Sequence, residues 1–246
     1  MATVNPRKSR LLRWNVKAKP TKTPESNLTL EQKIRREIFA WFWVVLAFLL
    51  INGTIGQARV IPSASMENTL LIGDHVIMSR VGYDAGVPFT HLHLPLWRNP
   101  RREQMVIFRP PIPGDPPDWI KRVVGLPGDT VDIHDGSVWI NGKKLQENYT
   151  LGRTDRAETT NVPMPYKVPQ NCYFVMGDNR QDSYDSRFVG CVPRQNIIGT
   201  PILIYMSVIA PEQAWDSGQI RERFSAYLNA LFHPGDIRWR RLFHTF

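Results

Sequence analysis

Two serine hydroxyls stand two residues apart in the segment Ile61-Pro-Ser63-Ala-Ser65-Met66. A serine hydroxyl becomes a nucleophile when a neighbouring base removes its proton. The same Ser-x-Ser spacing is also common in helix caps and polar loops, which is the usual outcome for an arbitrary pair. The pair is therefore a candidate nucleophile that requires a base from another part of the chain.

A candidate base is the lysine in the apolar segment Asp118-Trp119-Ile-Lys121-Arg-Val123-Val. Alternate side chains of a strand share a face, so Lys121 lies between Trp119 and Val123. Burial between apolar neighbours disfavours the ammonium form and lowers the lysine pKa, as a general base near neutral pH requires. A lysine on an edge strand that reaches water is the alternative, and it prevails in an average sheet.

Residues 176–190 form a third unusual segment, dense in Asp, Arg, Ser and Gly after an apolar strand pattern at residues 173–176. This composition fits either a solvated loop or a scaffold of ion pairs that fixes a loop near a site. No histidine has the neighbours expected of a catalytic base or a metal ligand, and no phosphate-binding glycine loop is present in the sequence. We therefore expect no metal and no cofactor.

The charge is concentrated in the N-terminal part of the chain. Residues 1–37 hold ten Lys or Arg and three Glu, a formal charge of +7, whereas residues 38–246 hold 21 basic and 19 acidic residues, a charge of +2. The positive charge thus belongs to a tail, and we expect no nucleic-acid partner. With 42% hydrophobic residues, the rest of the chain has the composition of a globular domain.

An uncharged stretch of about twenty residues follows this tail, enough for a helix to cross a bilayer core. We interpret residues 1–36 as a basic cytoplasmic tail and residues 37–57 as a single transmembrane helix. The positive charges before the stretch place the N-terminus in the cytoplasm and the following domain on the outer side. A cleaved signal peptide or an organelle transit peptide is the alternative, which the long charged leader and its three Glu disfavour.

Beyond residue 58, short β-type runs separated by Gly- and Pro-rich turns predict an all-β domain with mostly antiparallel strands over residues 58–210. Within it, the polar residues 143–170 look like an excursion from the sheet. Residues 211–246 combine a helical pattern with a basic-aromatic tail. The strand candidates are 60–61, 75–78, 105–108, 119–124, 130–133, 138–140, 172–176 and 202–205.

Two features have open interpretations. Cys172 and Cys191 flank the third segment, and they are either a disulfide on an oxidising side of the membrane or two buried thiols. The thiols are the preferred interpretation, because spacing alone cannot establish geometry. The tail at residues 237–246 is either a last core strand with Ile237 and Trp239 facing inward or a segment that contacts anionic lipid headgroups.

Together, and in this order, the three segments resemble bacterial type I signal peptidases, which are membrane-bound Ser/Lys proteases. The segment around Ser63 and Ser65, continued by Thr69-Leu70 and Gly73-Asp74, resembles the family's nucleophile box, and residues 121–129 and 177–190 resemble its lysine box and last box. The resemblance spans about residues 36–206. Departures are Asn68 in place of the usual Pro and Gln181-Asp182 in place of the commoner Asp-Asn.

The resemblance implies that Ser65 is the nucleophile and Lys121 the general base of covalent acyl transfer. It also implies that Ser63 and the Ser65 amide stabilise the oxyanion and that Ser183 holds the Lys121 ammonium. The other implied residues are two structural charge pairs, Asp178 with Arg122 and Asp185 with Arg187, and a set bordering pockets for small side chains, Ile61, Pro62, Met66 and Ile120.

The implied activity is removal of signal peptides from exported preproteins after Ala-x-Ala type sites, at the outer surface of the plasma membrane. The expected partners are preprotein signal peptides and the lipid bilayer. Two alternatives remain: a Ser/Lys relative that cuts itself or one dedicated partner, and an inactive anchored β-domain that binds envelope proteins. The anchor and the lack of DNA-binding helices disfavour the first alternative.

Overall fold

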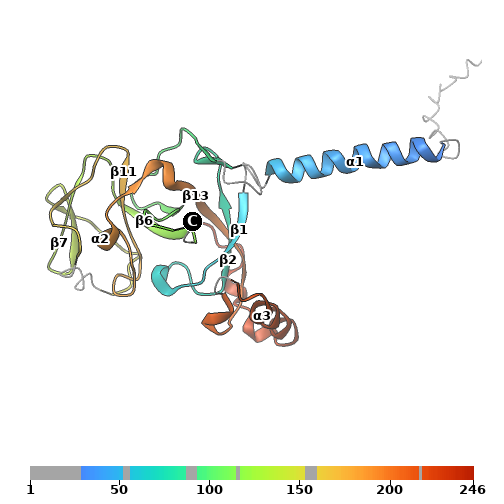
Figure 1. Cartoon of the computed structure of the whole chain (residues 1–246). Helices are drawn as coiled ribbons and strands as arrows, with labels where there is room; N and C mark the ends of the chain where they lie inside the picture. The colour runs from blue at the N-terminus through green and yellow to red at the C-terminus, as the bar shows by residue number, and fades with distance from the viewer. Residues whose placement is uncertain (1–28, 52–55, 87–92, 115–116, 153–159, 216–217) are drawn as a thin grey trace, which may run out of the picture. The chain divides into compact units, whose positions relative to one another are not determined.

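The structure is a computed structural model of the chain (Figure 1). It describes residues 29–51, 56–86, 93–114, 117–152, 160–215 and 218–246. Most of the predicted basic tail, residues 1–28, lies outside the described residues, as do residues 52–55 of the predicted membrane helix. The chain divides between Val45 and Leu46 into two units, which are described separately.

The first unit contains most of helix α1, Leu30–Leu50. A capping box begins this helix, because the Gln32 amide donates to the Thr29 hydroxyl and the Thr29 amide donates to the Gln32 side chain. The helix therefore begins earlier than the predicted residue 37 and ends at Leu50, and Gly56 and Gln57 belong to a strand. Among the described residues, no helix has the length and apolar composition needed to cross a membrane.

The second unit is mostly antiparallel β-sheet, as the sequence predicts (Figure 1). Its main sheet has seven strands in the order β1-β2-β13-β5-β6-β11-β12. The bounds are β1 Gly56–Val60, β2 Asp74–Ser79, β5 Met105–Phe108, β6 Trp119–Gly125, β11 Cys172–Met176, β12 Val192–Pro193 and β13 Ile197–Ser207.

Smaller elements complete this unit. A four-stranded sheet has the order β10-β7-β8-β9, and β3 pairs with β4. The strands are β3 Asp84–Gly86, β4 His93–Pro95, β7 Thr130–His134, β8 Ser137–Ile140, β9 Lys143–Lys144 and β10 Tyr166–Lys167. The helices are α2 Ser186–Val189, α3 Ile220–Phe232 and the short 3-10 turns η3 Ala64–Met66, η5 Arg194–Asn196, η6 Glu212–Trp215, η7 Pro234–Asp236 and η8 Trp239–Arg241.

Strand β6 lies in the interior of the main sheet, between β5 and β11. Val106 of β5 pairs with Lys121, and Met176 of β11 pairs with Arg122. Apolar side chains pack around this strand, including the fully buried Val123 and Phe108. Because both edges of β6 are hydrogen-bonded, the interpretation of Lys121 as an edge-strand residue is wrong.

Cys172 and Cys191 form a disulfide, so the preferred interpretation of two buried thiols is wrong. Strand β11 begins at Cys172 and pairs with β12, which begins one residue after Cys191. This antiparallel pairing brings the two Cα atoms to 5.7 Å. The bridge therefore closes the chain segment that carries the third motif.

We expect the Cys172→Ser/Cys191→Ser double variant to lose about 3 kcal/mol of unfolding free energy, because a loop of this length is no longer closed in the unfolded chain. Urea denaturation of the variant and of the wild type, each with and without reductant, measures the loss. The reductant should affect only the wild type. An unchanged midpoint in the double variant would contradict the bridge's contribution.

Two isolated bridges connect the C-terminal tail to β13 and to the residue after it, but the tail contains the 3-10 turn η8 and does not form the last core strand of the first interpretation. Ile237 bridges to Val208 and Thr245 bridges to Leu203, both antiparallel. Ile237 packs beside Val208 in a buried cluster, but Trp239 is 59% exposed, so the prediction that Trp239 faces inward is wrong.

The tail also makes an ion pair with the nucleophile motif. The Arg241 guanidinium binds the buried Asp74 carboxylate at 2.6 Å, which connects the tail to the end of this motif.

Candidate active site

Ser65 lies in the middle of the 3-10 turn η3, which follows β1 after a short link. Ser63 occupies the N-cap position of this turn, yet its side chain makes no capping hydrogen bond. The Ser63 hydroxyl instead lies 3.3 Å from the Ser65 hydroxyl. Ser65 is only 7% exposed, so the motif forms a compact turn that holds two hydroxyls together and is not an open polar loop.

Lys121 reaches Ser65 from β6. Its ammonium nitrogen Nζ donates to Ser65 Oγ at 2.5 Å, across a sequence separation of 56 residues. The lysine is 5% exposed, and its Nζ lies 6.0 Å from the centroid of the Trp119 ring. The sequence predicted this nucleophile and base from separate segments, and the structure brings them into direct contact.

Burial is the largest cause that lowers the pKa of Lys121, from 10.5 to about 8. The negative charge of Asp185 raises the pKa and Arg187 lowers it, so the loop after β11 also affects the base. Close to neutral pH, an appreciable fraction of Lys121 is thus the free amine. A free amine 2.5 Å from a hydroxyl can accept its proton.

We expect kcat/KM of the full chain in detergent to rise with pH and level off above the lysine pKa of about 8, because only the neutral amine accepts a proton. Initial rates on one peptide substrate without titrating groups in this range provide the profile. A profile that is flat through this pKa, or that falls as pH rises, would contradict the assignment of Lys121 as base.

Ser183 does not contact Lys121 through a described hydrogen bond. Its hydroxyl donates to the Asp185 carboxylate at 2.7 Å, and the Gly177 amide donates to the same oxygen at 3.0 Å. Burial alone would raise the pKa of Asp185, but the hydrogen bonds and charge of Arg187 lower it below its usual value. The buried carboxylate is therefore ionised and organises the loop beside the base.

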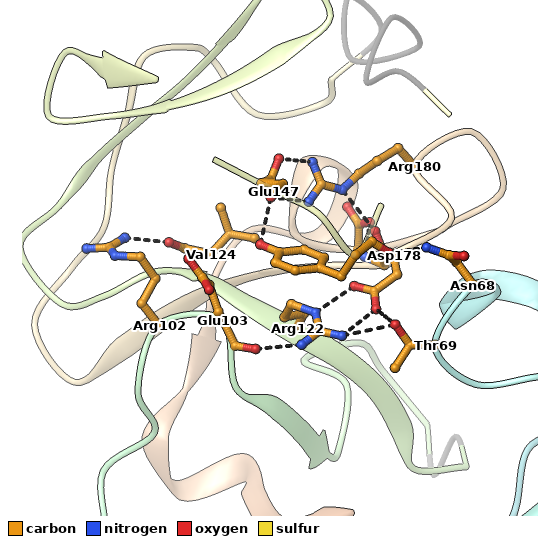
Figure 2. Close-up of polar contacts among 12 residues, drawn as sticks. Asn68, Thr69, Arg102, Glu103, Arg122, Val124, Glu147, Asp178 and Arg180 are labelled. Carbon is orange, nitrogen blue, oxygen red and sulfur yellow. Dashed lines mark hydrogen bonds and ion pairs between the residues drawn. The ribbon is translucent and has the colours of Figure 1, made fainter. Parts of the chain in front are cut away.

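Both predicted charge pairs are present as contacts. Arg187 Nε and Asp185 Oδ1 are 2.8 Å apart, with both side chains almost completely buried. Arg122 makes two hydrogen bonds to Asp178, at 2.8 and 2.6 Å, and the Thr69 hydroxyl donates to Asp178 at 2.5 Å (Figure 2). These contacts connect the nucleophile, lysine and last motifs.

A groove with a cavity volume of about 490 Å³ opens over the Ser65–Lys121 pair. Of the four residues expected to border pockets for small side chains, Pro62 and Ile120 line it. Ile61 and Met66 do not line the groove: they are buried in an apolar cluster with Leu70, and the groove residue Ile120 packs against this cluster. Their contribution in the structure is to the core under the nucleophile turn.

Other residues that line the groove were missed by the sequence analysis. Trp119 and Tyr184 form part of its wall, with ring centroids 5.8 Å apart, and Asp182 and Glu212 add carboxylates. Tyr184 is 54% exposed. Tyr184 and Asp182 lie inside the third motif. An aromatic residue among turn-forming polar residues was the sequence signal that could have identified Tyr184 as part of the groove.

Comparison with known proteins agrees with this geometry. The family model described as signal peptidase, peptidase S26, matches residues 34–206. Signal peptidase I of Leptolyngbya laminosa is 40% identical over 171 residues, which cover 67% of this chain and 75% of that protein. Signal peptidase I of Aquifex aeolicus is 32% identical over an alignment that covers 80% of this chain and 95% of that protein.

A further relative, the probable signal peptidase I-2 of a Synechocystis strain, is 37% identical over 169 residues, which cover 67% of this chain and 69% of that protein. The family model covers more than half of the chain and includes every residue of the three motifs. The chain therefore belongs to the bacterial signal peptidase I family of serine peptidases.

Proposed function

We propose that the protein removes signal peptides from exported preproteins by a Ser/Lys acyl-transfer mechanism. The observation that carries the proposal is the 2.5 Å contact between Lys121 Nζ and Ser65 Oγ at the base of a groove. Family membership supports the substrate class, and the contact supports the chemistry. Neither step of the reaction requires a metal or a nucleotide.

In the first half of the reaction, neutral Lys121 accepts the Ser65 proton while Ser65 Oγ attacks the scissile carbonyl. The oxyanion accepts hydrogen bonds from the Ser63 hydroxyl and the Ser65 amide. The Lys121 ammonium then gives its proton to the leaving amine, and the acyl group remains as an ester on Ser65. In the second half, Lys121 takes a proton from a water that attacks the ester carbonyl. The Lys121 ammonium then returns this proton to Ser65 Oγ as the bond between Oγ and the acyl carbon breaks, which releases the signal peptide and restores Ser65 and neutral Lys121.

The preferred cut follows small side chains of the Ala-x-Ala type. The groove is lined beside Ser65 by Pro62, Ala64 and Ile120, which are rigid or apolar and fit short side chains better than long ones. The substrate would bind as an extended segment along this groove. The buried Ile61 and Met66 belong to the apolar cluster against which the groove residue Ile120 packs.

The proposed location is the plasma membrane, with the uncharged residues 38–51 in the anchor, the N-terminus in the cytoplasm and the β-domain on the outer side. Gly56 and Gln57, which the sequence analysis included in the anchor, belong to strand β1. Residues 38–51 carry no charge, and the large side chains of this part of α1 are exposed, for example Trp41 at 64% and Phe48 at 56%. Exposed apolar side chains of this density favour a lipid environment.

Cleavage of a purified preprotein tests the proposed function. The full chain in detergent should release a mature protein whose new N-terminus follows a small residue, and Ser65→Ala should release none. Mass spectrometry of the product identifies the cut. Equal cleavage by Ser65→Ala would contradict the mechanism, and binding of the preprotein without cleavage by the wild type would favour an inactive binding domain.

A further inference from the structure

We infer that Glu147 and Tyr149 are positioning residues for the nucleophile turn. Both lie in the polar excursion after β9, a part of the chain that the sequence analysis set apart from the catalytic motifs. The inference rests on the proposed function, because it concerns the placement of Ser65 for acyl transfer. It is carried by a continuous series of contacts from this excursion to the backbone of Ser65.

The first contact is an ion pair with a buried arginine. Arg180, whose side chain is 0% exposed, makes two hydrogen bonds to the Glu147 carboxylate (Figure 2). The Glu147 side chain is itself 8% exposed. Arg180 Nε also donates to the carbonyl oxygen of Gly177 at 3.0 Å. Because an unpaired buried charge is costly, Glu147 keeps Arg180 and the turn after β11 in place.

Tyr149 connects this ion pair to a second one. Its hydroxyl donates to Glu147 at 2.9 Å. Its ring lies against the Arg122 guanidinium, with 4.1 Å between the guanidinium carbon and the ring centroid. Arg122 in turn binds Asp178 through two hydrogen bonds (Figure 2). One half-buried side chain thus contacts a member of each ion pair.

The backbone of the excursion makes two further contacts. The Asn68 side-chain amide donates to the Tyr149 carbonyl at 3.0 Å, and the Leu151 amide donates to the Asp178 carbonyl at 2.8 Å. Asn68 lies three residues after Ser65, and Asp178 lies in the last motif. The excursion is therefore hydrogen-bonded to both of the loops that meet at the active site.

The backbone conformation of Asn68 explains why this chain lacks the proline that the family usually has at this position. Its φ angle is 88°, a left-handed conformation that Asn tolerates. Proline has φ near −65°, so the usual family residue does not fit the turn as it is built here. The Asn side chain supplies the contact to Tyr149 from this turn.

The last contact reaches the nucleophile itself. The Asn179 amide donates to the Ser65 carbonyl at 3.1 Å, and the Thr69 hydroxyl binds Asp178. Glu147 and Tyr149 act through Arg180 and Arg122, which bind the turn that contains Asp178 and Asn179. Asp178 and Asn179 in turn hold both sides of the turn that presents Ser65. A shift of the turn would displace the Ser65 hydroxyl and the Ser65 amide together, and small displacements of reacting groups reduce turnover strongly.

The test compares Tyr149→Leu with Tyr166→Leu in the full chain. Tyr166 belongs to the same excursion and packs against Phe174 with ring centroids 5.4 Å apart, so its loss affects stability without touching the network. We expect Tyr149→Leu to lower kcat about tenfold with KM changed less than about twofold. Tyr166→Leu should keep the wild-type kcat at a temperature where thermal melts show both variants folded.

The pH profile of kcat/KM distinguishes a displaced nucleophile turn from a change in the burial of Lys121. Tyr149→Leu should lower the plateau of kcat/KM and leave the lysine pKa of about 8 in place, because Lys121 stays buried. A shift of that pKa toward 10.5, a wild-type kcat in Tyr149→Leu, or an equal loss in Tyr166→Leu would each overturn the inference.

If Tyr149→Leu does not fold, the Tyr149→Phe variant tests whether Tyr149 positions the nucleophile turn. It keeps the ring against Arg122 and removes only the hydrogen bond to Glu147, so we expect a kcat about threefold lower. A wild-type kcat in this variant would overturn the inference. Ser65→Ala is measured in parallel: if it cleaves as well as the wild type, the proposed function fails, which is a different result from a failure confined to the tyrosine variants.

Discussion

Lys121→Met is expected to fold and to lose about 1,000-fold in kcat, because methionine fits the buried site and offers no basic nitrogen to Ser65. Lys121→Arg is expected to lose as much, since a guanidinium stays protonated and cannot accept the hydroxyl proton. Peptide cleavage by the purified variants measures the loss, and circular dichroism with thermal melting establishes that they are folded.

Lys143→Met is the matched control for this substitution. Lys143 is an exposed residue of the short strand β9 and makes none of the described contacts to the active site. The control should retain wild-type turnover. Turnover of Lys121→Met within tenfold of the wild type would remove Lys121 from the mechanism, whatever its distance from Ser65.

Gly177→Ala is expected to lose about 100-fold in kcat, or to fail to fold. A β-carbon at position 177 would overlap the Ser65 carbonyl oxygen and the Ser183 hydroxyl. The carbonyl belongs to the backbone of the nucleophile turn, so relief of the overlap must displace either Ser65 or the end of β11. The first displacement moves the Ser65 hydroxyl relative to the Lys121 amine, and the second disturbs the loop that holds Ser183 and Asp185.

Gly235→Ala is the control for the alanine substitution itself. A β-carbon at Gly235 would meet no atom within 4 Å among the described residues, so turnover and melting temperature should stay at wild-type values. A folded Gly177→Ala variant with wild-type kcat would show that the turn tolerates displacement. That result would also weaken the inference that the placement of Ser65 is under tight control.

The sequence predicted the mostly antiparallel sheet and the residues that meet in the site, because both leave local signals. Alternating apolar runs identified strands such as β6. The resemblance of three motifs to a known family paired Ser65 with Lys121, although 56 residues separate them. The helix was predicted at residues 37–57, whereas α1 lies at Leu30–Leu50 and has the same number of residues. The prediction was displaced because the capping box begins the helix at Thr29 and the chain enters strand β1 at Gly56.

Other features depend on tertiary contacts that no local pattern records. The Ser183 hydroxyl binds Asp185 and not Lys121 by any described hydrogen bond. Ile61 and Met66 belong to a buried apolar cluster and not to the groove lining. The polar excursion lacks periodicity, so its contacts with the nucleophile turn through Tyr149 were invisible in the sequence. The disulfide required the pairing of β11 with β12.

The most direct test of the account is detection of the covalent intermediate. Wild-type enzyme and preprotein are mixed, quenched in acid at successive early times, and digested for mass spectrometry of the peptide that contains Ser65. We expect the mass of the signal peptide, less one water, as an ester on Ser65, and its absence in Ser65→Ala. An acyl group on a different residue, or undiminished cleavage by Ser65→Ala, would contradict Ser65 as the nucleophile.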